Sequence, residues 1–85
     1  MKLAIEYFGP VGDRMGPGSD TVTLDDRSVS LESLIDRIAK QLENGEAIRD
    51  PHLRIAINDQ LCGKTDILTL NDGDRIAFLS PFSGG

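Results

Sequence analysis

The last two residues, Gly84 and Gly85, are the group in this sequence best suited to chemistry. Because glycine has no side chain, a diglycine end can enter a narrow channel and present its terminal carbonyl to the groups of a partner. A free terminal carboxylate, with a pKa of about 3.3 to 3.7, is an anion at neutral pH and a poor electrophile, so another protein must activate it. The alternative is a solvated end without chemistry, because chain termini are often poorly ordered.

Other short motifs do not meet the requirements of a catalytic or metal site. Gly63-Lys64-Thr65 lacks the glycine five residues earlier that a phosphate-binding loop needs. Asn71-Asp72-Gly73-Asp74 lacks the acidic ligand of a calcium loop and indicates a tight turn. The adjacent side chains of Asp25-Asp26 point apart in an extended segment, which favours a solvated turn. We expect His52 to be a solvated loop residue and Cys62 a small apolar core residue, and we predict no metal site.

Composition limits the class of protein. With 85 residues the chain is one domain, and 39% hydrophobic and 27% charged residues are typical of a globular fold. The net charge of −5 disfavours nucleic acid and anionic membranes, and it favours partners with basic surfaces. A single cysteine and an amino terminus unlike a signal peptide predict a reducing, cytoplasmic location.

The strongest local signal is an amphipathic helix that begins after Ser30. Leu31, Leu34, Ile35 and Ile38 follow the spacing of one helical face, and Ser30 is a natural N-cap. Asn44-Gly45 is predicted to end the helix with a left-handed residue. Alternation and β-branched residues predict strands over 2–8, 21–24, 53–58 and 75–79, a short strand at 61–62 and a turn around 67–70. The glycines and prolines of 9–18 predict a long loop.

One helix and a group of strands predict an α+β domain in which the helix covers one face of the sheet. That face is predicted to carry Leu3, Ile5, Ile55, Ile57, Ile76 and Phe78. The opposite face, without a second helix, is predicted to carry Ala4, Glu6, Phe8, Arg54, Ala56, Arg75, Ala77 and Leu79. Phe8 and Leu79 are therefore candidates for a partner patch, although single exposed apolar residues are normal on any surface.

The predicted sheet ends close to Pro81, which cannot donate a hydrogen bond to a strand ladder. The sequence therefore predicts a domain over 1–80 and a flexible C-terminal diglycine tail over 81–85 that reaches about 15 Å from the domain.

Three segments carry a resemblance to a known family: SLESL at the helix start, LNDGDRIAF before the end, and PFSGG as the close. With them, the chain resembles the ubiquitin-like (β-grasp) sulfur carriers over its whole length, and among these the small subunits of molybdopterin synthase. The chain departs from the family pattern at Ser80, where a proline is usual, and at Phe82, where a smaller residue is common. The predicted loop after the first strand replaces a short helix of many relatives.

The resemblance implies a β-grasp fold, with a mixed sheet and one main helix, and a non-catalytic subunit that carries sulfur. A separate adenylating enzyme would use ATP to make a Gly85 acyl-adenylate, which sulfur converts to a thiocarboxylate. The larger synthase subunit would then transfer that sulfur to the pterin precursor of molybdopterin, in a hetero-oligomer and with no cofactor bound to this chain. The residues predicted to contact these partners are Phe8, Arg54, Arg75, Leu79, Pro81, Phe82, Ser83 and Gly84.

Three alternatives remain open at this point. A thiamine-pathway sulfur carrier has the same fold, diglycine and activation chemistry but is usually shorter. A protein modifier would use Gly85 to form isopeptide bonds. A plain interaction module would have a tail that does no chemistry.

Overall fold

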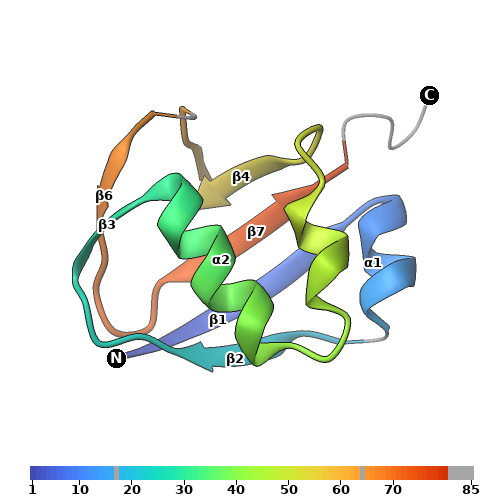
Figure 1. The fold of residues 1–85 in the computed structure, drawn as a ribbon, viewed down its shortest axis with the longest axis horizontal. Helices are drawn as coiled ribbons and strands as arrows, with labels where there is room; N and C mark the ends of the chain where they lie inside the picture. The colour runs from blue at the N-terminus through green and yellow to red at the C-terminus, as the bar shows by residue number, and fades with distance from the viewer. Residues whose placement is uncertain (17, 64, 81–85) are drawn as a thin grey trace.

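A five-stranded mixed sheet forms the centre of the computed structural model, which describes residues 1–16, 18–63 and 65–80 (Figure 1). The strand order is β2-β1-β7-β4-β5. The central strands β1 (Lys2–Phe8) and β7 (Arg75–Leu79) run parallel, whereas β2 (Asp20–Thr23), β4 (Arg54–Ile57) and β5 (Gln60–Leu61) pair antiparallel with their neighbours. The main helix, α2 (Leu31–Gln41), lies across one face of this sheet. The predicted β-grasp α+β fold is confirmed.

The face of the sheet under α2 is the core. Leu3, Ile5, Ile76 and Phe78 are fully buried there, together with Leu34 and Ile38 of the helix. Full burial of such a side chain contributes roughly 1.5–3 kcal/mol. The alternation read from the sequence therefore assigned the inner face correctly. Ile57, at the end of β4, is only partly buried.

A second, two-stranded sheet joins the start of α2 to the segment before β7. Its strands are β3 (Ser28–Ser30) and β6 (Ile67–Thr69), which pair antiparallel with Val29 opposite Leu68. The sequence did not predict β3, because three residues are too short for a periodic signal. The predicted turn around 67–70 is wrong, because Ile67–Thr69 form the strand β6. Val29 and Leu68 are both buried, so this small sheet closes the core at its edge.

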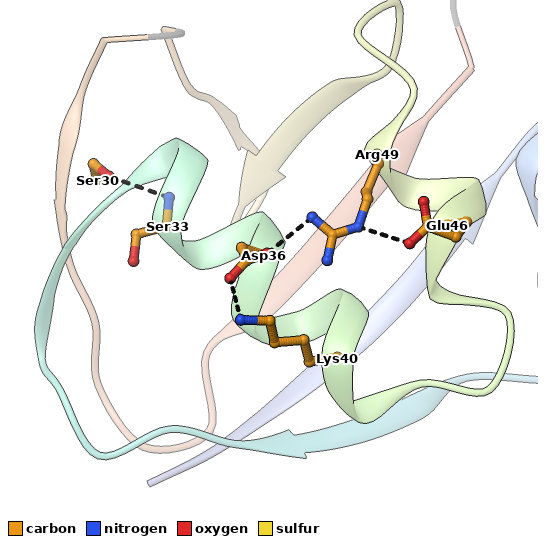
Figure 2. A network of polar contacts seen from close by, with 6 residues as sticks. All are labelled: Ser30, Ser33, Asp36, Lys40, Glu46 and Arg49. Atoms are coloured by element: carbon orange, nitrogen blue, oxygen red, sulfur yellow. Dashed lines mark hydrogen bonds and ion pairs between the residues drawn. The ribbon is translucent and has the colours of Figure 1, made fainter.

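The predicted start of α2 is confirmed, whereas its predicted end is wrong. The Oγ of Ser30 accepts a hydrogen bond from the backbone N–H of Ser33 at 3.1 Å, as an N-cap does (Figure 2). The helix ends at Gln41, and Gly45 is not among the described glycines with positive φ. Gly45 instead begins the 3₁₀ helix η1 (Gly45–Arg49), where a Cβ would lie 1.9 Å from the carbonyl oxygen of Ala39.

The prediction of an uninterrupted loop over 9–18 is also wrong. Residues Pro10–Met15 form a short helix, α1, whose Val11 is buried in the core. Proline occupies the start of this helix, where its missing N–H has no cost and its φ is already helical. Gly9 and Gly16, both with positive φ, bound the helix. Many relatives have a short helix after the first strand, so α1 removes the departure from the family pattern that a loop would have been.

Ion pairs on the exposed surface tie η1 to α2 (Figure 2). The Arg49 guanidinium lies 2.9 Å from Asp36 and 3.1 Å from Glu46, and the Lys40 ammonium lies 3.0 Å from the other oxygen of Asp36. Hydrogen bonds from Lys40 and then Arg49 lower the pKa of Asp36. Because these groups are solvated, their pairs orient η1 more than they stabilise the fold.

Tyr7, on the inner face of the sheet, is a side chain whose titration reports on the fold. Its ring stacks on Phe78 with centroids 6.3 Å apart, and its hydroxyl donates to Asp20 at 2.6 Å. Burial raises the pKa of Tyr7, and the hydrogen bond to Asp20 and the charge of Asp20 raise it further.

We therefore expect the folded protein to show almost no tyrosinate absorbance at pH 11, where a tyrosine with a pKa of about 10 is roughly nine-tenths ionised. The chain has one tyrosine and no tryptophan, so a spectrophotometric titration is unambiguous. The associated stability is complete below pH about 10 and declines as pH rises from there toward the folded pKa, because only the unfolded chain ionises in that window. Asp20→Asn should lower the midpoint but leave it above the ordinary value. A wild-type midpoint near pH 10 with native circular dichroism would contradict this account.

Candidate functional site

The outer face of the sheet carries a row of three predicted partner-binding residues. Leu79 lies opposite Phe8 in the parallel β1–β7 pair and opposite Arg54 in the antiparallel β4–β7 pair. Residues in register share a face, so the three side chains project side by side. Phe8 is 49% exposed, Arg54 is exposed and Leu79 is half-buried. The structure therefore brings together Phe8, Arg54 and Leu79 as the sequence predicted.

The adjacent row adds a residue that sequence reasoning missed. Leu61 lies opposite Ala56, which lies opposite Ala77, and Leu61 is 61% exposed. We call the apolar side chains of the two rows the outer patch; its members are Phe8, Ala56, Leu61, Ala77 and Leu79. Ala56 is buried between its neighbours, and Glu6, opposite Ala77, ends the second row with a charge. The sequence carried a signal for this hairpin in Asn58-Asp59, because asparagine and aspartate tolerate positive φ. Both residues have positive φ in the structure. A two-residue hairpin loop of this kind fixes the register that places Leu61 across from Ala56.

The two predicted arginines differ in what they contact. The guanidinium of Arg75 lies 2.7 Å from Asp59, and its backbone N–H donates to Asn58 at 3.0 Å. Arg75 lies beside Ala4 in the register, away from the row of Phe8. Arg54 makes no ion pair with the residues that the structure describes. Arg54 is therefore the cation at the outer patch that is available to a partner, while Arg75 supports the β4–β5 hairpin.

Ser80 fixes the end of β7 against two other segments. Its backbone N–H donates to the carbonyl of Phe8 at 3.0 Å, and its Oγ accepts from the N–H of Val11 at 2.9 Å. The point where the predicted tail begins is thus held next to Phe8 of the outer patch. The predicted tail over 81–85, with Pro81, Phe82, Ser83, Gly84 and the predicted reactive residue Gly85, lies outside the described residues.

The remaining motifs have structural roles. Asp74 accepts hydrogen bonds from Asn71 and Asn58, and Gly73 has φ 88°, which confirms the predicted turn. His52 is exposed, with Nδ1 3.1 Å from Asp50. Cys62 is half-buried against the core, and burial followed by the charge of Asp66 raises its pKa.

Within 1–16, 18–63 and 65–80, no group of three or more histidine, cysteine or acidic side chains could hold a metal ion. In the same part of the chain, no helix has the length and apolar character needed to cross a membrane.

Comparison with known proteins bears directly on this arrangement. The chain is similar to a chain in the protein–protein complex of subunits 1 and 2 of molybdopterin-converting factor from Helicobacter pylori 26695, with 26% identity, both chains covered in full and a TM-score of 0.67. It also shares its fold with SAMP1 from Haloferax volcanii, with 16% identity, full coverage of both chains and a TM-score of 0.73. No curated protein matches the chain significantly.

The family comparison covers almost the whole chain. The model of the ThiS family matches residues 5–85, which include all of the sheet except the start of β1, together with α2, the outer patch and the terminal diglycine. The mixed sheet under one main helix agrees with that match. The chain therefore belongs to the ThiS family and is a ubiquitin-like sulfur carrier.

Proposed function

We propose that this chain is the sulfur-carrying small subunit of a molybdopterin synthase, and that Gly85 is the residue that carries the sulfur. The observation that supports this pathway is the full-length similarity, at 26% identity, to a chain of the molybdopterin-converting factor complex. The outer patch next to Ser80 supports the proposal, because it offers a larger subunit an apolar surface beside the start of the tail.

The proposed chemistry takes place at the carbonyl of Gly85. An oxygen of the terminal carboxylate attacks the α-phosphorus of ATP on a separate adenylating enzyme, and pyrophosphate leaves. Hydrosulfide, or a donor that delivers sulfur at the same oxidation level, then attacks the acyl-adenylate and displaces AMP, which leaves a thiocarboxylate. Adenylation is required because the free carboxylate is a poor electrophile, and it makes AMP the leaving group. In the larger subunit, the thiocarboxylate sulfur attacks the pterin precursor, and water then cleaves the bond between this sulfur and the Gly85 carbonyl carbon, which restores the Gly85 carboxylate.

Three measurements test this function. Intact mass spectrometry after incubation with the cell's adenylating enzyme, ATP and a sulfur source should show a gain equal to the difference between sulfur and oxygen. Expression in one host that lacks the small subunit of molybdopterin synthase, and in another that lacks the thiamine-pathway carrier, separates the two pathways. We expect rescue of molybdopterin synthesis alone. Rescue of thiamine synthesis alone, or a ladder of protein adducts in the native cell, would contradict the proposed pathway.

The outer patch gives a further prediction about partner binding. Phe8→Asp or Leu79→Asp places a carboxylate in an apolar contact, and we expect either change to weaken the complex with the larger subunit by at least tenfold, as for a central interface residue. Both side chains are partly exposed, so the thermal unfolding temperature should change little. Isothermal titration calorimetry measures the affinity, with Ser19→Asp in an exposed loop as the matched control. Unchanged affinity for both variants would exclude the outer patch from the interface.

A further inference from the structure

The outer face of the sheet carries opposite charges at two corners of the outer patch. Glu6, on β1, ends the second row, and Arg54, on β4, ends the first row. Glu6 is half-buried and Arg54 is exposed, and neither forms an ion pair with a residue in 1–16, 18–63 or 65–80. Within this part of the chain, both charges are therefore available to another molecule.

The two corners lie diagonally across the outer patch. Strand β7 separates β1 from β4, so Glu6 and Arg54 are two strand spacings apart, about 4.8 Å each. They are also two residues apart along the strands, at about 3.3 Å for each residue. Their Cα atoms are therefore roughly 12 Å apart, with the apolar side chains of Ala77 and Leu79 between them.

A second copy of the chain matches this diagonal arrangement. In an isologous pair, residue i of one copy contacts residue j of the other, and j contacts i. When two outer faces meet in this way, Glu6 of each copy can face Arg54 of the other. The line midway between these corners passes between Phe8 and Leu79, which are neighbours in the first row. The same two-fold axis therefore packs Phe8 of each copy against Leu79 of the other.

We propose that the outer face forms a homodimer, in which two outer patches pack together between two Glu6–Arg54 ion pairs. Charge complementarity favours a second copy as the occupant, because the face carries both the anion and the cation that a two-fold axis brings together. The dimer is weak, since the patch is small and each chain has a net charge of −5. We expect a dissociation constant of about 0.1–1 mM.

The dimer also has a consequence for the proposed function, on which this step rests. The outer patch is the surface that we assign to the larger synthase subunit, so one chain cannot use it for both contacts. The homodimer would keep Phe8 and Leu79 out of water while the carrier is free, and the tighter-binding larger subunit would replace the second copy. The larger subunit therefore competes with self-association.

Charge reversal tests the homodimer on the full chain alone. Sedimentation equilibrium of the wild type at concentrations up to about 1 mM should show reversible dimerisation. Glu6→Arg and Arg54→Glu should each raise the dissociation constant at least tenfold, because both ion pairs become contacts between like charges. Glu43→Arg and Arg27→Glu make the same changes in net charge at exposed positions outside the outer face. These controls should stay within about twofold of the wild type.

A mixture of the two reversed variants gives the sharpest result. Glu6→Arg has two arginines at its corners and Arg54→Glu has two carboxylates, so both ion pairs can form again between one copy of each. We expect the equimolar mixture to dimerise as the wild type does, although neither variant dimerises alone. A wild type that is monomeric at about 1 mM, or a mixture that does not associate, would overturn the proposal. If Glu6→Arg does not fold, Arg54→Glu compared with Arg27→Glu decides the matter.

Addition of the larger subunit tests the competition. We expect it to convert the wild-type dimer into a complex in which the carrier has no contact with a second carrier through its outer face. Sedimentation velocity with labelled carrier follows this exchange. A larger subunit that binds the carrier dimer without dissociating it would show that the two contacts use different surfaces. If no larger subunit binds the carrier at all, the proposed function fails, while the charge-reversal results still decide whether the homodimer exists.

Discussion

Removal of Gly85 should abolish sulfur loading, with a loss of at least a hundredfold in thiocarboxylate yield. The shortened chain still ends in a carboxylate, on Gly84, but that group lies about 3.3–3.6 Å short of the position of the original one. A displacement of only 1 Å can cost about a hundredfold in a reaction that depends on orientation. Intact mass spectrometry after incubation with the adenylating enzyme, ATP and a sulfur source measures the yield.

Gly85→Ala is the informative control for this deletion. It keeps the length of the chain and its terminal carboxylate, and it adds only a methyl group at the last residue. We expect it to be loaded more than the deletion variant but less than the wild type, because a diglycine end leaves the narrowest profile. Thermal unfolding of all three proteins should coincide. Full loading of the deletion variant would show that Gly85 is not the sulfur-carrying residue, and intact function without it would favour a plain interaction module.

Gly45→Ala should be the most destabilising single methyl addition among the described glycines. The new Cβ would lie 1.9 Å from the carbonyl oxygen of Ala39 and 2.7 Å from its carbonyl carbon, both backbone atoms of α2. Backbone atoms cannot rotate away as a side chain can, so η1 must separate from the helix. We expect a loss of about 2–4 kcal/mol in the free energy of unfolding. In a domain of this size, that lowers the melting temperature by at least about 10 °C.

Gly12→Ala is the matched control, since it adds the same methyl group where there is room. A Cβ at Gly12 would meet Tyr7 no closer than 3.6 Å, an ordinary contact. Gly12 lies inside α1, where alanine is favoured over glycine by roughly 0.5–1 kcal/mol. Differential scanning calorimetry should therefore show an unchanged or slightly higher melting temperature for Gly12→Ala. Equal stability of Gly45→Ala and the wild type would mean that η1 is not packed against Ala39 as described.

The outer patch shows how far the sequence predicts a binding surface. Alternation in β1, β4 and β7 placed Phe8, Arg54 and Leu79 on one face, because successive strand residues point to opposite sides. Only the pairing register shows that these three form one row. The register also adds Leu61 to the patch, and the contact with Asp59 engages Arg75 in an ion pair.

By itself, the sequence determined the features that depend on neighbouring residues: the inner and outer faces of the main strands, the Ser30 cap of α2, and the tight turns at Asn58-Asp59 and Asn71–Asp74. These follow from local spacing and backbone preference. The diglycine and the segments of the family resemblance were also readable without a structure.

The tertiary structure decided the features that depend on distant contacts. Helix α1 forms among glycines and prolines because Ser80, at the other end of the chain, caps it and the core buries Val11. Strand β3 exists through its pairing with β6, and Gly45 is required by the approach of Ala39 rather than by its own φ. The pocket between α1, the η1–β4 connection and the end of β7 likewise arises from three separate segments. Long-range packing outweighs local propensity wherever a segment is too short to form an element alone.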